Sequence, residues 1–320
     1  MQIRILTASD IRAALSMPAA IDAVETAYSQ LSAGKASMPL RSGVKTDRGV
    51  TLVMPAHLHD SGDFAVKIVS VYPDNPKNNL PTVSATVLAL DPATGVPLAL
   101  MEGDALTALR TGAAGGVAAR YLARKNASRV ALFGAGVQAR SQLQAAMAVR
   151  RIERVLVVDP FEAAVRRLMD DVAGWPDAPE VRIADSPRQA VAQADIVLAA
   201  TTTKTPLFDG NDIKAGTHVT GVGSFTPEMQ EIDAVTIGRA RVVVDQREAA
   251  LAEAGDIIIA KATIDADIGE IINGDKPGRE SDDQITYFKS VGLAVQDAVA
   301  AAAVLKSAEA KGLGTVIQMS

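Results

Sequence analysis

The chain has 320 residues, 48% of them hydrophobic and 22% charged, which indicates a folded globular protein of about two domains. Its net charge of -5 disfavours a nucleic-acid partner, and the lack of roughly 18 uninterrupted apolar residues disfavours a membrane span. The absence of cysteine excludes disulfides and thiolate chemistry and fits a reducing compartment, so we expect a cytoplasmic protein.

The first part of the chain predicts one helix followed by several strands. Pro18 suits a first helical turn, apolar residues recur on one face as far as Leu31, and Gly34 ends the run. The strand-like segments that follow have no helical pattern between them, which predicts an antiparallel or mixed sheet in an α+β domain. These segments are Gly49–Met54, Phe64–Val71, Thr82–Leu90 and Pro97–Met101.

The pattern changes near residue 113. After a helical stretch at Ala113–Arg124, short apolar strands alternate with helices such as Gln138–Ala148 and Phe161–Val172, which is typical of a doubly wound parallel sheet. The predicted strands are Arg129–Phe133, Arg154–Val158, Val181–Ala184, Asp195–Ala200, His218–Gly221 and Arg241–Val244.

A last, Ala-rich helix at Ala294–Ala310 is expected to return to the first domain. The sequence therefore predicts an α/β protein with two domains. Residues 114–293 form a Rossmann domain that binds NAD(P), and residues 1–113 plus 294–320 form a discontinuous α+β domain.

The segment Gly134–Ala139 has the Gly-x-Gly-x-x-Ala pattern, directly follows a predicted strand and opens a helix. In this context Gly134 permits a tight turn, Gly136 lets the backbone approach a pyrophosphate, and Ala139 permits close helix packing. The helix N-terminus offers free N–H groups to the phosphates. The predicted cofactor contacts are Gly134, Gly136, Val137, Gln138, Ala139 and Arg140.

Asp159 ends the next predicted strand, 20 residues after Ala139. A carboxylate at this position hydrogen-bonds the adenosine ribose and repels a 2′-phosphate, which favours NAD(H). Arg166 and Arg167 follow closely and keep NADP(H) open as the alternative.

Two other groups of polar residues permit more than one interpretation. Thr201 and Thr202 follow a predicted strand at its carboxyl end, where both a contact with the cofactor ribose and an ordinary loop fit them. His57 and His59 have the spacing of two metal ligands, but the remaining histidine, His218, lies far along the chain. We therefore expect no metal site.

Three cations lie in apolar surroundings: Arg41, Lys67 and Arg110. Buried cations need anionic partners, and arginine forks that hold a carboxylate would provide one, so we expect a small anionic substrate. Lys67 is then the candidate proton donor, because an amine titrates more readily than a guanidinium. Taken singly, each cation also fits a solvated or salt-bridged residue, and spacing alone does not bring them together.

A series of short motifs runs through nearly the whole chain. They are Met38–Arg41, Val66-Lys67, Tyr72–Pro76, Leu80–Thr82, Asp91–Gly95, Leu106–Thr111, Gly134–Arg140 and Phe288–Gly292. In this order they resemble the ornithine cyclodeaminase/mu-crystallin family. The resemblance implies a homodimer formed through the first domain and an active site between the domains. It also implies that Arg41 and Arg110 bind a substrate carboxylate and that Lys67 lies beside the reacting carbon and nitrogen.

The same resemblance supplies further cofactor contacts. Thr111 is expected to touch a cofactor phosphate, and the segment that contains Ser290 and Gly292 is expected to lie near the nicotinamide. Gly223 completes the predicted cofactor contacts.

One segment departs from the cyclodeaminases of the family. Their catalytic Asp stands in a Gly-Gly-Asp segment, and alignment on Pro227 and Glu231 puts Phe225 at that position. A phenyl ring cannot accept a proton, which disfavours ornithine cyclisation. The sequence from Gly223 to Met229 resembles instead the Δ1-pyrroline-2-carboxylate reductase branch, with Phe225 as an apolar wall of the substrate site.

We therefore expect an NAD(P)H-dependent oxidoreductase that reduces a cyclic ketimine carboxylate to L-proline, in proline metabolism. Arg41 and Arg110 would hold the carboxylate, and Lys67 would keep the imine nitrogen protonated while the nicotinamide provides hydride. The sequence leaves the ring size open. The alternatives are an alanine dehydrogenase acting on pyruvate and ammonia, an ornithine cyclodeaminase-type lyase, and a binding protein in the manner of mu-crystallin.

Overall fold

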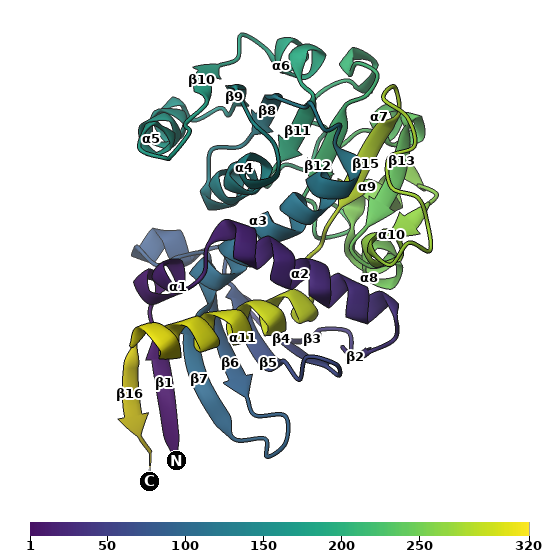
Figure 1. Cartoon of the computed structure of the whole chain (residues 1–320). Coiled ribbons are helices and arrows are strands. Elements are labelled where there is room, and N and C mark those ends of the chain that lie inside the picture. Colours follow the sequence, from purple (N-terminus) through teal and green to yellow (C-terminus); the bar gives the residue numbers. More distant parts are fainter. Residues whose placement is uncertain (320) are drawn as a thin grey trace. The chain divides into compact units, whose positions relative to one another are not determined.

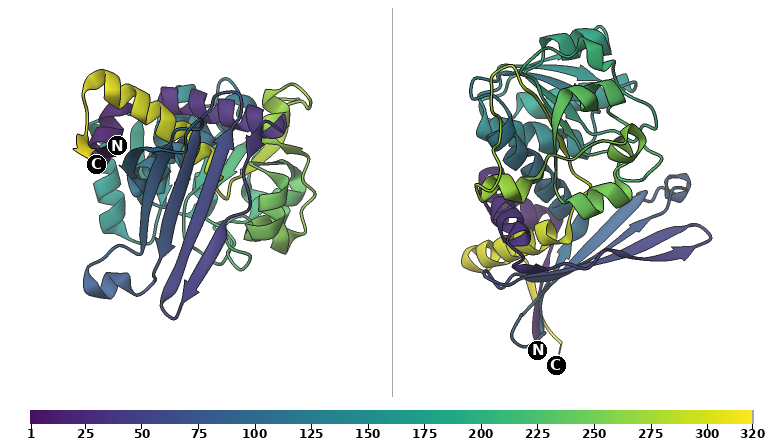
Figure 2. Two further views of the ribbon diagram at one scale, coloured as in Figure 1. Left: turned by 90° about the horizontal axis from the view of Figure 1, so that it is seen from below. Right: turned by 90° about the vertical axis from the view of Figure 1, so that its right-hand side faces the viewer.

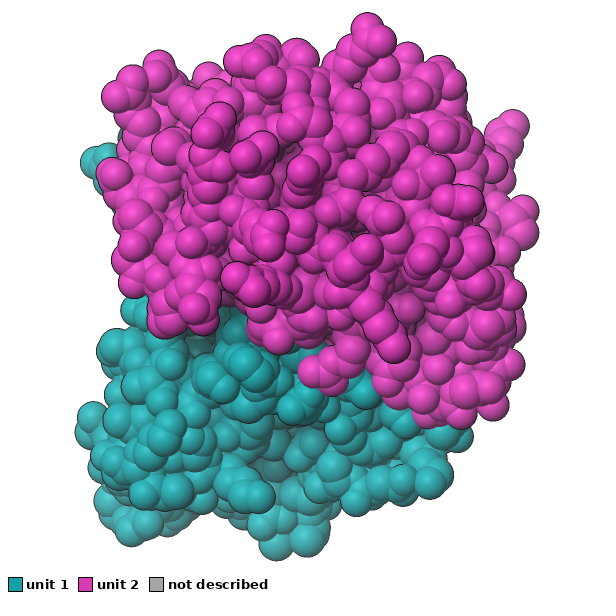
Figure 3. Space-filling view, turned by 45° about the horizontal axis from the view of Figure 1, so that its top comes forward, with its two compact units in different colours: residues 1–110, 293–320 teal, residues 111–292 magenta. Residues whose placement is uncertain are grey.

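The computed structural model describes residues 1–319, and the chain divides into two compact units (Figure 3). Unit 1 comprises Met1–Arg110 and the segment that begins at Leu293, and unit 2 comprises Thr111–Gly292. The predicted border after residue 113 lies three residues later than the observed border after Arg110. The predicted border after residue 293 lies one residue later than the observed border after Gly292.

Unit 1 contains a mixed β-sheet (Figure 1). Its strands are β1 (Gln2–Leu6), β2 (Ala36–Ser37), β3 (Ser42–Thr46), β4 (Gly49–Leu58), β5 (Phe64–Val71), β6 (Val83–Leu90), β7 (Pro97–Glu102) and β16 (Thr315–Gln318). The order across the sheet is β16-β1-β7-β6-β5-β4-β2, with β3 also paired to β4. β1 is parallel to β7 and the central pairs are antiparallel, which confirms the predicted mixed sheet.

Helices cover one face of this sheet. They are α1 (Ala8–Ala14), α2 (Met17–Ser32) and α11 (Ala294–Lys311), and a 3-10 turn, η1 (Asn75–Asn78), follows β5. α11 packs against α2, β4 and β5, and every residue from Ala294 to Ala301 is buried. A helix that is buried all round is a core element, and small alanine side chains let it approach the sheet closely. Figure 2 (left) shows the strands from the opposite face.

Unit 2 contains a sheet in which all strand pairs are parallel. Its strands are β8 (Arg129–Phe133), β9 (Arg154–Val158), β10 (Glu180–Ile183), β11 (Ile196–Ala199), β12 (His218–Gly221), β13 (Ala240–Val244), β14 (Ala266–Asp267) and β15 (Ile285–Lys289). The order is β10-β9-β8-β11-β12-β15-β13-β14, so the winding reverses between β8 and β11. This confirms the predicted doubly wound Rossmann sheet, in which ligands bind at the switch point.

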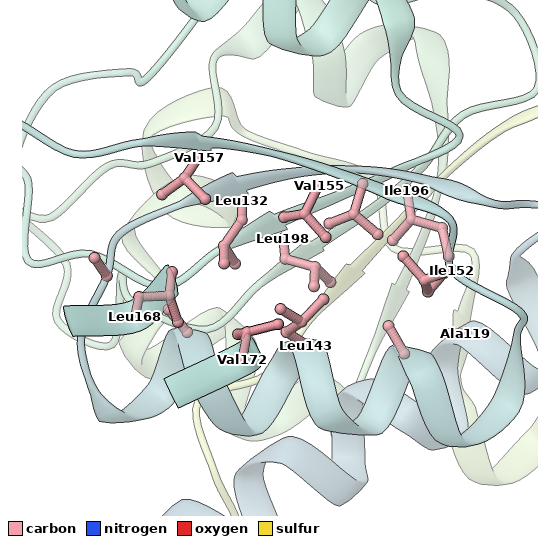
Figure 4. Packing of buried hydrophobic residues seen from close by; sticks show 14 of the residues in the cluster. Ala119, Leu132, Leu143, Ile152, Val155, Val157, Leu168, Val172, Ile196 and Leu198 are labelled. Carbon is pink, nitrogen blue, oxygen red and sulfur yellow. The ribbon is translucent and has the colours of Figure 1, made fainter. Parts of the chain in front are cut away.

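Helices pack on the sheet of unit 2 around an apolar core (Figure 4). They are α4 (Val137–Val149), α5 (Glu162–Ala173), α6 (Pro187–Gln193), α7 (Ala234–Arg239), α8 (Arg247–Glu253), α9 (Gly255–Ala260) and α10 (Ile268–Ile272), with a 3-10 turn η2 (Gly210–Asp212). The helix α3 (Gly103–Leu122) starts in unit 1, and its part from Thr111 onward belongs to unit 2. Leu132, Val157 and Leu198 from three neighbouring strands meet Leu143 of α4 and Leu168 of α5 in this core. Burial of these side chains stabilises the sheet that carries the glycine turn.

The prediction for α3 is wrong at its start, because the helix begins at Gly103 rather than at residue 113. Glycine lowers helix propensity, and Gly103 and Gly112 bound the stretch that was missed. Both are needed for close packing: a Cβ at Gly112 would lie 2.6 Å from the Ser141 carbonyl oxygen, and one at Gly103 would lie 2.4 Å from the Ala85 carbonyl carbon.

The sequence also did not predict β15, a strand in the middle of the parallel sheet. Its sequence, Ile-Thr-Tyr-Phe-Lys, contains polar side chains, and they are satisfied only by tertiary partners. β1, α1, β3 and β16 were likewise not predicted. In the part of the chain that the structure describes, no helix is both long enough and apolar enough to cross a membrane.

Candidate active site residues in the two units

Lys67 lies in the middle of β5, with its side chain on the face that α11 covers. Across the sheet it is level with Met54 on β4 and Val87 on β6, both buried, and it is itself only 2% exposed. Burial, followed by the charge of Arg110, lowers the pKa of Lys67 from 10.5 to about 8. A lysine with this pKa exchanges a proton readily near neutral pH.

Arg110 lies in α3 and is also buried, with 5% of its surface exposed. Its Nε donates a hydrogen bond to Oδ1 of Asp297 over 3.0 Å, and its Nη1 donates to Oε1 of Gln296 over 2.6 Å. Gln296 Nε2 in turn donates to the Tyr28 hydroxyl over 2.5 Å. Among residues 1–319, no hydrogen bond of Arg110 uses Nη2, so this group remains available to a ligand.

Asp297 connects the two cations. Its Oδ2 lies 2.8 Å from Lys67 Nζ and its Oδ1 binds Arg110, and the carboxylate is 1% exposed. The sequence reasoning missed this residue, although a lone acidic residue in the apolar start of the Ala-rich α11 was an available signal.

Arg41 lies between β2 and β3 and is half-buried. Its charge also lowers the pKa of Lys67, so it is within electrostatic range of the amine. The structure thus brings Lys67 and Arg110 together on one buried carboxylate, Asp297, with the charge of Arg41 acting on the Lys67 amine. This arrangement has a surplus of buried positive charge, which favours an anionic ligand.

The glycine turn of unit 2 connects β8 to α4. Gly134 has a φ of 98°, and a Cβ there would lie 2.6 Å from the Ala200 carbonyl oxygen, so only glycine fits. A Cβ at Gly136 would meet nothing within 4 Å, and Val137 at the first helical position is 65% exposed. Gln138 Oε1 is buried and has no hydrogen-bond partner in the described chain. Open space, exposed helix-terminal backbone and an unpaired acceptor fit a bound dinucleotide.

Asp159 follows β9 and faces the glycine turn. Its Oδ2 accepts a hydrogen bond from the Ala135 N–H over 2.9 Å, and its Oδ1 accepts one from the Phe161 N–H over 2.8 Å. A carboxylate has further lone pairs, so it can also accept ribose hydroxyls. Ala139 of α4 is buried in the apolar core between the helix and the sheet, as predicted for its small side chain.

Arg140 has partners other than a phosphate. Its Nε donates to Asp171 over 2.7 Å and its Nη1 donates to the Ala135 carbonyl oxygen over 2.5 Å. The guanidinium therefore braces the glycine turn, and its contact with a cofactor phosphate stays a prediction.

Glu231, a fully buried carboxylate, holds the loops that follow β11 and β12. Its Oε1 accepts from both the N–H and the hydroxyl of Thr201 over 2.6 and 2.8 Å, and its Oε2 accepts from the Gly223 N–H over 2.6 Å. Burial raises the pKa of Glu231, and the charge of Lys289 opposes that shift. The Thr201 hydroxyl is thus committed to Glu231, whereas Thr202 is exposed.

Asp245 holds the segment that follows β15 by accepting hydrogen bonds from it. Its Oδ2 accepts from the Ser290 hydroxyl over 2.8 Å and from the Gly292 N–H over 3.0 Å. The Ser290 side chain therefore points to Asp245. Thr111 is buried at the start of unit 2, where its carbonyl oxygen accepts from Gln142 Nε2 over 2.7 Å.

Ser224 and Phe225 have opposite environments. The Ser224 hydroxyl is buried, donates to Asp256 over 2.5 Å and accepts from Lys289 over 2.6 Å. Phe225 is 41% exposed. The neighbouring Tyr287 hydroxyl also donates to Asp256, over 2.8 Å. Sequence reasoning missed Asp256 and Lys289, because each becomes significant only through residues far away in the chain.

The parallel sheet, its switch point and the glycine turn define unit 2 as a Rossmann-type dinucleotide-binding fold. The model of the ornithine cyclodeaminase/mu-crystallin family matches residues 1–312. The chain belongs to this family.

Several relatives match almost end to end. An alanine dehydrogenase of Archaeoglobus fulgidus is 37% identical over 325 residues, covering 99% of each chain. The solved structure of Thermococcus litoralis Δ1-pyrroline-2-carboxylate reductase in complex with NADH and L-proline has a TM-score of 0.91 and 42% identity, covering 98% of this chain and 99% of that one. An archaeal alanine dehydrogenase dimer with bound NAD has a TM-score of 0.93 and 36% identity over the whole of both chains.

Proposed function

We propose that this protein is an NADH-dependent reductase that converts Δ1-pyrroline-2-carboxylate to L-proline. The observation that carries the proposal is that two buried cations, Lys67 and Arg110, share the single buried carboxylate of Asp297, which leaves one positive charge in excess. Such a cluster selects a small anion, and a lysine with a pKa near 8 suits an imine that must stay protonated. The similarity to a reductase whose structure holds NADH and L-proline supports this substrate.

The residues of unit 1 have separate tasks in this reaction. Arg110, through its remaining N–H groups, and Arg41 bind the substrate carboxylate, as arginine forks do. Lys67 keeps a proton on or near the imine nitrogen, which makes the adjacent carbon electrophilic. Phe225, which belongs to unit 2, is the proposed apolar wall for a ring that carries no distal charge.

The residues of unit 2 hold the dinucleotide. The backbone of Gly134–Ala139 binds the pyrophosphate, and Asp159 accepts the ribose hydroxyls, which favours NAD(H) over NADP(H). Thr111, Arg140, Thr202, Gly223 and the Ser290–Gly292 segment are the further proposed contacts. When bound, NADH supplies the hydride that the substrate carbon accepts.

Alanine dehydrogenase is the second candidate, and the identity to the Archaeoglobus fulgidus enzyme favours it. Pyruvate also carries a carboxylate, and the imine that it forms with ammonia would need the same lysine and arginines. Ornithine cyclisation is disfavoured because Phe225 offers no acceptor for a proton or an ammonium group.

One comparison of substrates separates these activities. NADH is supplied with Δ1-pyrroline-2-carboxylate, with its six-membered homologue, or with pyruvate plus ammonium, and NAD is supplied with ornithine. We expect the highest kcat/KM with the five-membered ring, measured by the loss of NADH absorbance and the formation of L-proline. Faster turnover of pyruvate and ammonium would make the chain an alanine dehydrogenase. Conversion of ornithine to proline without net NADH formation would make it a lyase.

A cytoplasmic homodimer acting in proline metabolism completes the proposal. On the sheet face away from α11, Pro55, Val66, Leu88 and Leu100 are level on β4, β5, β6 and β7 and form a continuous apolar row. Ile68, on the same face, is 47% exposed. An apolar surface of this kind suits contact with a second copy, and the archaeal relative is a dimer. Light scattering should give twice the chain mass, and Leu88→Lys should give the monomer mass.

A further inference from the structure

Asp297 lies in the first turn of α11, where the helix dipole favours a carboxylate. It is nevertheless one of the most buried charged residues of unit 1, at 1% exposure. A desolvated carboxylate is tolerated only where it is paired. Its two oxygens are divided between two partners, Lys67 at 2.8 Å and Arg110 at 3.0 Å.

The charged groups around the Lys67 amine act on it in opposite directions. Arg110 on α3 and Arg41 before β3 lower the pKa of Lys67, whereas Asp297 on α11 raises it. Asp104, at the start of α3, is exposed. Burial raises the pKa of its carboxyl, and the charge of Lys67 lowers that pKa only as the smallest of the causes. The neighbours of Lys67 on β4 and β6, Met54 and Val87, carry no charge. Asp297 is therefore the buried anion that opposes the two arginines.

We propose that Asp297 is a positioning residue that keeps Lys67 protonated and fixes Arg110 through Nε, so that the outer edge of the guanidinium is left for the substrate carboxylate. The inference rests on the proposed function and adds a residue to it. Gln296 assists by holding Arg110 Nη1, and it is fixed in turn by Tyr28.

This role has a defined place in the reaction. Reduction of the C=N bond adds hydride to carbon and one proton to nitrogen, so the site must start each cycle with a proton that solvent later replaces. An ammonium at Lys67 supplies that proton or retains it on the substrate. If the Asp297 carboxylate is removed, its raising effect on the pKa of Lys67 is lost while burial and the two arginines still lower that pKa, so the amine becomes neutral at a lower pH.

The test is the pH dependence of kcat/KM for Δ1-pyrroline-2-carboxylate in Asp297→Asn. In the wild type we expect kcat/KM to fall above a pH of about 8, where Lys67 loses its proton. In Asp297→Asn this limb should move down by about one pH unit or more. The ionisation of the substrate itself is the same in every variant and cancels in the comparison.

Two variants act as controls. Gln296→Glu is nearly isosteric and adds a carboxylate beside Arg110, so it should move the limb upward; it also keeps the test decisive if Asp297→Asn does not fold. Asp195→Asn removes a carboxylate that bridges Arg124 and Lys214 in unit 2 and should leave the limb where it is. A uniform loss of kcat/KM at every pH in Asp297→Asn, with no movement of the limb, would reduce Asp297 to a structural residue and overturn the inference.

A second measurement needs no substrate, so it separates this inference from the proposed function. Because the pKa of Lys67 is about 8 in the folded chain and 10.5 ordinarily, the unfolded chain binds more protons between these values. The free energy of unfolding should therefore rise with pH across that window. In Asp297→Asn this rise in the free energy of unfolding should begin at a lower pH, and in Lys67→Met the rise should be absent. If no variant reduces the imine but the window moves in this way, the proposed function fails and the role of Asp297 stands. If the window does not move, the role of Asp297 fails.

Discussion

The two units both bury charged residues, but they satisfy them in different ways. In unit 2, Asp256 accepts hydrogen bonds from Ser224, Tyr287 and backbone N–H groups and pairs with Lys289, which lies 3.3 Å from it. In unit 1, Asp297 lies 2.8 Å from Lys67 and 3.0 Å from Arg110, so two buried cations share one buried carboxylate.

This difference distinguishes buried charges that stabilise the fold from buried charges that are candidates for binding a ligand. Buried charges that the chain itself satisfies hold loops in place, as Glu231 and Asp245 do at the carboxyl ends of the parallel strands. A buried cluster with more cations than anions is costly to fold, and an anionic ligand would lower that cost, which is the basis of the role proposed for Lys67 and Arg110. Substitutions of the two buried lysines should therefore have opposite consequences.

The largest effect is expected for Lys67→Met. Methionine fills the same volume without the ammonium, so kcat/KM should fall by about 10²–10⁴-fold. The free energy of unfolding should change little, because Asp297 keeps Arg110 as its buried partner after the Lys67 ammonium is removed. Dinucleotide affinity, measured by fluorescence titration with NADH, should stay near that of the wild type. Turnover within a few-fold of the wild type would show that Lys67 is not the proton-holding group.

Lys289→Met should have the opposite profile. It leaves Asp256 without its cation in a fully buried position, which costs about 3–5 kcal/mol in the free energy of unfolding. Denaturant titration of both methionine variants measures the contrast directly. Equal free energies of unfolding for the two variants would contradict the view that Asp256 and Lys289 stabilise each other while Lys67 is kept for a ligand.

The smallest effect concerns cofactor choice. Asp159→Ala removes an acceptor for ribose hydroxyls and the carboxylate that repels a 2′-phosphate, so the preference for NADH over NADPH should narrow about tenfold. Ratios of kcat/KM with the two cofactors measure it. Asp171→Ala, which releases Arg140 from its exposed partner, is the matched control and should affect both cofactors alike. An unchanged ratio in Asp159→Ala would remove the reason for expecting NAD(H).

Local patterns predicted most of the strands that form the two sheets. Phe64–Val71, Arg129–Phe133, Arg154–Val158 and His218–Gly221 were predicted with the bounds that the structure has. These strands consist largely of apolar and β-branched residues between clear turn signals. β15 and the first half of α3 were missed, because Lys289 and the glycines Gly103 and Gly112 contradict the local pattern and are explained only by their tertiary partners.

The sequence by itself determined the parallel nucleotide-binding fold, its glycine turn with Asp159, and the presence of three unusual cations. Each of these is encoded in residues close together in the chain, where strand, turn and helix preferences act. Tertiary structure alone decided that Asp297 lies between Lys67 and Arg110, and that Asp256, Glu231 and Asp245 hold the loops of unit 2. The physical reason is that the cost of a buried charge depends on which partner folding brings to it, and those partners lie far away in sequence.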